Sequence, residues 1–269
     1  MSSPKTNKSL ARRLRRFYIA QPLSNEKKLM RLSAAESHHL RNIIRLRSGD
    51  HCLVTDGRGW EAEASIREFT EEGLAILDIL KITKKSKERP NAVFFRAMPV
   101  LLQKGKNDYL VEKAQELGVD ELWPLTSERC ELRIPKEKIE KIVDRWKRIV
   151  VEASKQSGRL TMARILEPRS LKEAVQSMED KDALVVFHPG AGSIPFPEWI
   201  EEYRAVKAGI KSLNLLIGPE GGFTEDEIDW VRAQSKNRNV WFVEFGETVY
   251  RADTAFVGIL GALRFLGVV

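Results

Sequence analysis

The stretch that decides the fold is Leu215-Leu216-Ile217-Gly218-Pro219-Glu220-Gly221-Gly222-Phe223-Thr224-Glu225-Asp226-Glu227, where an apolar run stops at a glycine-rich turn. Residues 213–217 are predicted to form a buried strand, because the run is short, almost wholly apolar and bounded by Gly-Pro. Thr224 and Glu227 have the spacing of a capping box, which predicts that a helix begins at Thr224. A strand, a tight turn and a helix in this order place the turn at the carboxyl end of a sheet strand, where open α/β sheets bind ligands.

The glycine-rich turn fits either a binding loop or a plain strand-to-helix connection. Gly218, Gly221 and Gly222 permit backbone conformations closed to other residues and allow a ligand to approach the main chain. The turn lacks the Lys-Ser/Thr of a P-loop and the spacing of the dinucleotide fingerprint. Glu220 and the acidic pair at 225–226 also place negative charge at the helix start, so a cationic or zwitterionic ligand suits it better than a phosphate.

A second turn of this kind follows the apolar run 240–243, and it has the sequence Glu244-Phe245-Gly246-Glu247-Thr248-Val249-Tyr250-Arg251-Ala252-Asp253-Thr254-Ala255. A helix to about Phe265 is expected after it. That helix is apolar nearly all round, so we expect it to be buried or to lie in a subunit interface. Arg251 is a lone cation at the mouth of this element. A cation is poorly placed for the dipole of a helix start, which favours a functional reason for Arg251 over a surface arginine.

Together these motifs resemble the signatures of the SPOUT class of RNA methyltransferases and, more narrowly, of the ribosomal RNA small subunit methyltransferase E family. The likeness covers nearly the whole chain beyond the first dozen residues. It is carried, in one order and at similar spacing, by Arg15–Phe17, His38–Leu40, Arg45–Leu46, Gly49–Asp50, Gln103–Lys106, Glu112–Val119, Pro124–Leu125, Ser127–Arg129, Arg145–Trp146, Glu152–Arg159, Gly218–Gly222, Phe245–Gly246 and Arg251–Ala255. The chain departs from the family where Phe245 and Tyr250 replace leucines and where Asp253 replaces a glutamate.

The chain is expected to form two domains after a basic arm at residues 1–14. Residues 15–88 contain mostly short strands and predict a small β-barrel-like module, which the resemblance assigns to a PUA-like RNA-binding domain. Within it, Ser33 and Glu36 have capping-box spacing and predict a helix through Leu46. The charged segment 83–91 ends in Arg-Pro and is the expected linker.

The C-terminal part alternates strands with helices, which predicts a mostly parallel α/β sheet. The resemblance implies that residues 89–269 form a SPOUT methyltransferase domain with a C-terminal trefoil knot. The clearest expected helix is 138–153, whose apolar residues follow the amphipathic spacing. The strands expected in the whole chain are 17–20, 51–55, 60–66, 74–82, 93–98, 121–125, 183–187, 213–217 and 240–243.

The composition of the chain indicates what kind of partner it binds and in which cellular compartment it works. The net charge of +7 over 269 residues indicates a polyanionic partner, nucleic acid first, with an ordinary basic enzyme as the alternative. The two cysteines are far apart and have no metal-ligand spacing, so we expect a reducing, cytoplasmic setting and no metal. No apolar stretch reaches the length of a membrane span. The basic arm is expected to be disordered and to attract RNA, with a transit peptide as the alternative.

The resemblance implies S-adenosyl-L-methionine as cofactor, bound mainly through backbone groups of three loops. Backbone binding accounts for glycines in place of a set of fixed side chains. The cofactor-binding residues that the resemblance implies are His188, Gly190, Ile217, Gly218, Pro219, Glu220, Gly221, Phe245, Gly246, Tyr250, Arg251 and Thr254.

The implied reaction is methylation of N3 of a uridine in 16S ribosomal RNA. N3 carries a proton at neutral pH, and a cation beside the ring oxygens would stabilise the uridinate. Arg251 is the first choice for this catalytic role. Glu220 and Asp253 are candidate bases, but Glu220 orienting its loop and Asp253 capping the last helix are the structural alternatives.

The expected RNA-binding residues come from two places in the sequence. Arg16, Arg45 and Arg47 are candidates for phosphate contact, and Gln156 and Arg159 for positioning the base or a phosphate. A solvated basic face is the alternative for any one of them. The expected partners are the small ribosomal subunit and a second copy of the chain, with the apolar C-terminal helix in the homodimer interface.

Two other functions stay open from the sequence. One is a non-catalytic RNA-binding factor of ribosome assembly on the same fold, which the departures at Tyr250 and Asp253 allow. The other is a nucleotide-using enzyme, which the missing P-loop lysine and the acidic helix start oppose. The sequence leaves open the exact nucleotide, and whether free rRNA or the assembled subunit is the substrate.

Overall fold

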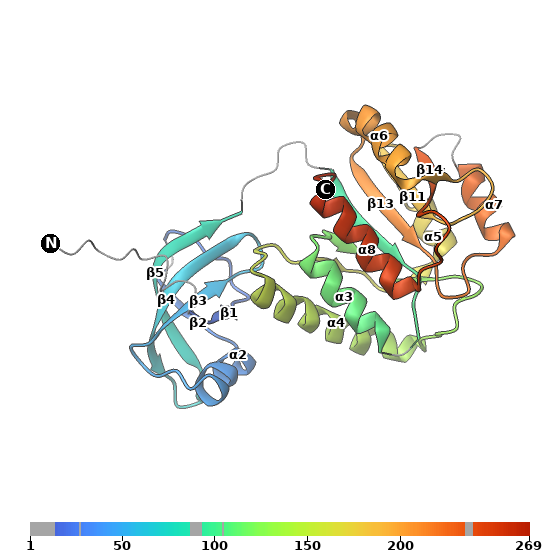
Figure 1. Cartoon of the computed structure of the whole chain (residues 1–269). Coiled ribbons are helices and arrows are strands. Elements are labelled where there is room, and N and C mark those ends of the chain that lie inside the picture. Colours follow the sequence, from blue (N-terminus) through green and yellow to red (C-terminus); the bar gives the residue numbers. More distant parts are fainter. Residues whose placement is uncertain (1–13, 27, 87–92, 104, 235–238) are drawn as a thin grey trace. The chain divides into compact units, whose positions relative to one another are not determined.

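The computed structural model describes residues 14–26, 28–86, 93–103, 105–234 and 239–269 (Figure 1). The chain divides into two compact units: unit 1 contains residues 1–88 and 154–162, and unit 2 contains residues 89–153 and 163–269. The expected basic arm lies outside the described residues except for Leu14, and so does most of the expected linker. Residues 83–85 of that linker continue a strand of unit 1.

Unit 1 is built on a five-stranded sheet with one short helical segment. In spatial order the strands are β1 (Arg16–Tyr18), β3 (His51–Thr55), β4 (Trp60–Phe69), β5 (Ala75–Lys85) and β2 (Leu29–Arg31). β1 is parallel to β3, and the other pairs are antiparallel. Inward side chains of these strands form one apolar core with Leu40, and it includes Phe17, Cys52, Val54, Ala62, Ala64, Ile66 and Leu77.

The helical segment of unit 1 is shorter than predicted. Ser33 Oγ accepts the Glu36 N–H at 3.3 Å, as the capping box requires, and α2 (Ala34–His38) follows. A π-helical turn, η1 (His39–Ile43), comes next, so the helix does not continue to Leu46. Arg45 takes a left-handed backbone conformation with φ +63°, and the Leu46 N–H bonds back to the Leu40 carbonyl at 3.0 Å. A left-handed residue in this position ends a helix.

The Glu36 carboxylate does not complete the capping box, because it is engaged across unit 1. It accepts the Tyr18 N–H at 3.1 Å and the Lys155 ammonium at 2.8 Å. The Lys155–Glu36 pair is almost fully buried. The chain near 160 also bonds to the turn after β3, through Gly59 N–H to Leu160 O at 2.9 Å and Met162 N–H to Gly57 O at 3.0 Å. Residues 154–162, which the sequence analysis placed in the C-terminal domain, are therefore part of unit 1.

Unit 2 contains a parallel sheet of seven strands, which confirms the predicted mostly parallel α/β architecture. In spatial order the strands are β12 (Ile194–Pro195), β14 (Val240–Glu244), β11 (Asp182–Phe187), β13 (Ser212–Ile217), β6 (Phe94–Pro99), β7 (Glu121–Leu122) and β9 (Arg164–Ile165). The strand predicted at 121–125 is split, because Pro124 has no N–H to donate to the ladder. Its second half is β8 (Leu125–Thr126), which pairs with β10 (Arg169–Ser170).

The helices of unit 2 occupy the connections between its strands, except the last helix, which follows β14 at the end of the chain (Figure 1). They are α3 (Lys106–Glu116), α4 (Lys136–Ser157), α5 (Leu171–Gln176), α6 (Phe196–Val206) with the 3₁₀ turn η2 (Lys207–Gly209), α7 (Glu225–Ala233) and α8 (Ala252–Phe265). α4 covers the predicted helix, and its end at residues 154–157 belongs to unit 1. α7 starts after Thr224 with both halves of the predicted capping box present. α8 packs against α3 and β13.

The last helix is only partly covered in the single chain. Phe256, Ile259 and Leu263 are buried. At its end Phe265 is 85 % exposed and Leu266 50 % exposed. One face of α8 therefore belongs to the core of unit 2, while its C-terminal end presents apolar side chains to solvent. Among the residues described, no helix has the length and apolar character to cross a bilayer.

Candidate functional site

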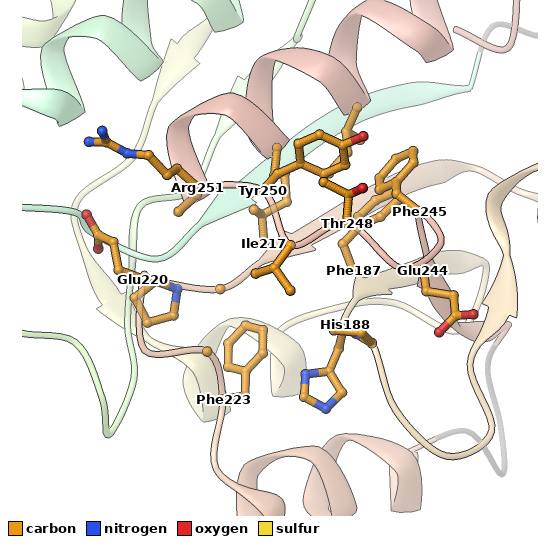
Figure 2. A pocket seen from close by; sticks show the side chains of 18 of the residues that line it. Phe187, His188, Ile217, Glu220, Phe223, Glu244, Phe245, Thr248, Tyr250 and Arg251 are labelled. Carbon is orange, nitrogen blue, oxygen red and sulfur yellow. The ribbon is translucent and has the colours of Figure 1, made fainter.

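The cavity of unit 2 lies where three neighbouring strands end. β14, β11 and β13 are adjacent and parallel, and Phe187 at the end of β11 pairs with Ile217 on one side and Val243 on the other. The turns that follow these strands therefore open on one edge of the sheet. These turns, of which the one after β14 leads into α8, line a cavity of about 840 Å³ (Figure 2). This is the position at which open α/β sheets bind ligands.

Most of the cofactor-binding residues expected from the sequence line this cavity. They are His188, Ile217, Gly218, Pro219, Glu220, Gly221, Phe245, Gly246, Tyr250 and Arg251. Gly190 and Thr254 are not among the lining residues. A Cβ added at Gly190 would lie 3.5 Å from the His188 ring. Thr254 is exposed in the first turn of α8.

Among the lining residues outside the expected set are Arg129, Phe187, Phe223 and Ile259. Phe187 is the last residue of β11, beside Ile217 at the end of β13. The last residues of adjacent parallel strands lie at one edge of the sheet, and this rule would have predicted Phe187 from the sequence. Arg129 comes from the segment after β8, about 90 residues before the glycine-rich turn in the sequence, and only tertiary packing places it here.

The glycine-rich turn has the backbone that its sequence predicts. Gly222 adopts φ +68°, and its N–H bonds to the Pro219 carbonyl at 2.9 Å. A side chain at Gly218 would come within 3.1 Å of the Phe223 ring. The first turn of α7 carries Glu225, Asp226 and Glu227, so the helix start is as acidic as predicted. This arrangement disfavours a phosphate and therefore the nucleotide-using alternative.

Aromatic rings form one wall of the cavity. Phe245 stacks on Phe187 with centroids 5.4 Å apart and planes 9° apart, and it packs on Phe196 at 4.7 Å. Phe187 and Phe196 also contact the ring of Trp199. Aromatic pairs in these geometries stabilise one another beyond the area they bury. The replacement of the family's leucine by Phe245 therefore fits its surroundings.

His188 contributes its imidazole to the cavity, in surroundings that favour the neutral form. Burial, and next the charge of Arg232, lower the pKa of His188 below its usual value. The loop that carries it is held by Ser193 Oγ donating to the His188 carbonyl at 2.7 Å and by Arg232 Nη2 donating to the Ala191 carbonyl at 3.1 Å. A neutral ring in this position tolerates a cationic ligand, whereas a protonated one would repel it.

Two charged residues stand on one side of the cavity, Arg251 and Glu220 (Figure 2). Glu220 is in an ion pair with Lys106 at 2.6 Å. Arg251 is 71 % exposed, and its Nε lies 3.6 Å from Asp253 Oδ1. That Oδ1 is buried and has no hydrogen-bond partner among the described residues.

The expectation that Asp253 caps the last helix is wrong. The N-cap residue of α8 is Arg251, and no side chain makes a capping hydrogen bond there. Asp253 is the second residue of α8, and its carboxylate lies beside the Arg251 guanidinium. This position suits it to hold that guanidinium instead. Asp253 is not among the residues that line the cavity.

The expected RNA-binding residues all belong to unit 1, and the structure separates them into two kinds. Arg16 is only 16 % exposed, and it donates to Glu61 Oε2 at 2.6 Å and to the Lys155 carbonyl at 2.7 Å. These bonds engage Arg16 inside the unit, and its phosphate contact stays a prediction. Arg45, Arg47 and Gln156 are exposed, and Arg159 is half-buried.

The part of the chain that the structure describes contains no candidate metal-binding site. No three His, Cys, Asp or Glu side chains there are arranged to hold an ion. Cys52 and Cys130 are both buried free thiols.

Comparison with known families assigns the chain to a class of protein. The family model described as RNA methyltransferase domain matches residues 90–264, and the model described as RNA methyltransferase PUA domain matches residues 32–80. The chain therefore belongs to the RNA methyltransferases that carry this domain.

Relatives narrow the family further. The chain is 26% identical over 238 residues to ribosomal RNA small subunit methyltransferase E of Bacillus subtilis, which covers 87% of this chain and 89% of the relative. The structure resembles ribosomal RNA small subunit methyltransferase E of Neisseria gonorrhoeae bound to S-adenosyl methionine, with a TM-score of 0.80 and 25% identity over 94% of this chain and 98% of that one. A putative methyltransferase of Legionella pneumophila in complex with the cofactor matches with a TM-score of 0.79, 25% identity and the same coverage. The chain is a member of the ribosomal RNA small subunit methyltransferase E family.

Proposed function

We propose that this protein transfers a methyl group from S-adenosyl-L-methionine to N3 of a uridine in the 16S ribosomal RNA of the small subunit. The observation that carries the proposal is the cavity at the ends of β14, β11 and β13, with the exposed Arg251 at its mouth. Its volume of about 840 Å³ lies in the range of small-molecule sites. Family membership and the cofactor-bound relatives support the choice of cofactor and substrate.

The lining of the cavity fits this cofactor. Backbone groups of residues 217–221 and 245–250 would bind its polar groups, and the wall of Phe187 and Phe245 would contact its ring system. The acidic side chains at the rim and a neutral His188 suit a sulfonium cation. When bound, the cofactor supplies an electrophilic methyl group.

Arg251 would act on the RNA side of the reaction. The N3–H bond breaks and an N3–carbon bond forms, while the methyl–sulfur bond breaks and its electron pair stays on sulfur. A guanidinium beside the ring oxygens stabilises the negative charge that develops on the base as the proton leaves. Because Glu220 is paired with Lys106 and Asp253 with Arg251, we assign the N3 proton to solvent and not to either carboxylate.

The proposal extends to assembly. Apolar side chains are exposed beside the cavity and at the end of α8, with Val249 at 89 % and Phe265 at 85 %. Covering such side chains is a favourable contribution to association. We propose that two copies of the chain form a homodimer that buries these side chains. We also propose that the protein acts on ribosomes in the cytoplasm and that the chain of unit 2 is threaded as a trefoil knot. Light scattering of the wild type and of Phe265→Glu tests the dimer, and a monomeric wild type at micromolar concentration would contradict it.

The experiment that tests the function is transfer of labelled methyl groups to small ribosomal subunits, and to free 16S rRNA, from cells that lack this gene. Arg251→Ala is assayed in parallel, and the product nucleoside is identified by mass spectrometry. We expect 3-methyluridine with the wild type and little with the variant. RNA binding by the wild type without methyl transfer to either substrate would instead support a non-catalytic assembly factor.

A further inference from the structure

The segment after β8, residues 127–133, is fixed against the glycine-rich turn, and we call it the mouth segment. The Glu128 N–H donates to Glu227 Oε1 at 2.8 Å, and the same carboxylate accepts the Thr224 N–H at 3.0 Å in the capping box of α7. Arg129 Nη1 donates to the Gly221 carbonyl at 3.0 Å. Gly221 has no side chain to obstruct this contact, since an added Cβ would meet the Arg129 side chain at 3.4 Å.

The mouth segment carries two exposed arginines, each anchored by one hydrogen bond. Arg129 lines the cavity, and its hydrogen bond within the described part of the chain is the one to the Gly221 carbonyl. Arg133 Nη1 donates to the Ser127 carbonyl at 3.3 Å. A guanidinium has five N–H donors, so each arginine keeps most of its donors for another acceptor.

Two carboxylates near the mouth segment are engaged by other groups. Glu220 is held by Lys106 at 2.6 Å, and Glu131 accepts from Gln103 Nε2 at 2.6 Å. Neither Arg129 nor Arg133 forms an ion pair within the described residues. Glu128 and Glu131 leave the mouth segment without net charge, so what the two arginines offer is a pair of oriented guanidiniums, four residues apart, that no carboxylate of the described residues binds. Arg129 presents its donors at the cavity itself.

We propose that the mouth segment is an RNA-contact surface, on which Arg129 and Arg133 bind phosphates of the strand that delivers the target base. This inference rests on the proposed function. Anchored guanidiniums bind phosphate well, because their donors are already oriented. The cofactor's single carboxylate is the other anion that Arg129 could bind. Arg133 favours RNA, because it lies outside the cavity lining and adds a second anchored guanidinium that the cofactor's carboxylate does not account for.

The bond to Gly221 adds a consequence for the reaction. The guanidinium that holds the RNA also contacts the backbone of the turn that lines the cofactor cavity. RNA bound through Arg129 is thereby placed relative to that turn, as an in-line methyl transfer requires. Arg129 is in this sense a positioning residue for the RNA strand, and Arg251 acts on the base itself.

The test compares Arg129→Ala, Arg129→Lys and Arg133→Ala with a matched control, Arg148→Ala, which removes one exposed charge from α4. Affinity for a 16S rRNA transcript is measured across salt concentrations, and cofactor affinity is measured separately by calorimetry. We expect both mouth alanine variants to bind RNA about tenfold more weakly, with the salt slope reduced by about 0.7–0.9. Arg129→Lys should keep the slope, and Arg133→Ala, which lies outside the cavity lining, should keep the wild-type cofactor affinity.

Two results would overturn the inference. If Arg129→Ala loses cofactor affinity while RNA binding is unchanged, the guanidinium binds the cofactor's carboxylate. If both mouth variants bind RNA like Arg148→Ala, the surface makes no specific phosphate contact. These binding measurements need no methyl transfer, so they remain decisive even if the wild type shows no activity on 16S rRNA.

Discussion

Arg16 and Arg251 are both arginines that the sequence marks as functional, but the structure uses them differently. Arg16, in unit 1, is 16 % exposed and bonds to Glu61 and to the Lys155 carbonyl. Arg251, in unit 2, is 71 % exposed at the mouth of a cavity, with one carboxylate 3.6 Å away. A guanidinium whose donors are used internally stabilises the fold, and one whose donors face a cavity can stabilise developing charge. The same residue type thus separates into a structural and a chemical role by its surroundings.

Replacing Arg251 should have the largest effect on activity. For Arg251→Ala we expect the rate of methyl transfer to fall about 10²- to 10³-fold, the magnitude of losing one preorganised donor to a developing oxyanion. The thermal midpoint should stay unchanged, because the side chain is exposed. Single-turnover kinetics with saturating cofactor measures the first, and calorimetry the second. An unchanged rate would remove Arg251 from the mechanism.

Replacing Arg16 should act on stability instead. Arg16→Met leaves the buried Glu61 carboxylate without its nearest partner, and we expect a loss of about 3 kcal/mol in the free energy of unfolding. The double variant Arg16→Met/Glu61→Leu should recover most of it, since an apolar pair can replace a buried ion pair. Urea denaturation reports both. A normal urea midpoint with weakened RNA binding would return Arg16 to the role expected from the sequence.

His188 should make cofactor binding depend on pH. Its pKa is lowered in the folded chain from 6.5, so the unfolded chain takes up the proton first. Its contribution to stability is therefore complete above pH 6.5 and is lost as pH falls through the lowered value. A cationic ligand disfavours the protonated ring further, so cofactor affinity should fall as pH drops through the lowered pKa of His188 in the folded chain, by at most about tenfold per pH unit. Calorimetry on His188→Gln should show a flatter profile, and an identical slope would exclude His188 as the titrating group.

The smallest effect is expected at Arg45, an exposed arginine whose backbone is strained. Because Arg45 has φ +63°, a glycine there should stabilise unit 1 by about 0.5 kcal/mol. If Arg45 contacts phosphate, the same change should weaken RNA binding severalfold. Arg47→Gly is the matched control and should bring no gain in stability, because Arg47 does not have a positive φ. If Arg45→Gly loses stability and keeps its RNA affinity, both the backbone strain at Arg45 and its phosphate contact are contradicted.

Local sequence signals predicted the cavity loops well. The capping box at Thr224 and Glu227, the strands that end at Ile217 and Phe187, and the glycine turns depend on neighbours within a few residues. Signals that need distant partners were not visible. Glu36 has capping-box spacing, yet its carboxylate bonds to Lys155, more than a hundred residues away. Arg129 reaches the cavity through a bond to Gly221, which no spacing rule connects to it.

The sequence by itself determined the class of fold, the turns that can approach a ligand, and the family to which the chain belongs. These properties follow from short-range patterns of apolar, glycine and capping residues, and from the order of motifs. Tertiary structure alone decided that residues 154–162 complete unit 1 and that Arg129 joins the cavity, and it separated the roles of Arg16 and Arg251. The physical reason is that burial and the partners of a charge depend on contacts between segments far apart in the chain, which residue order does not encode locally.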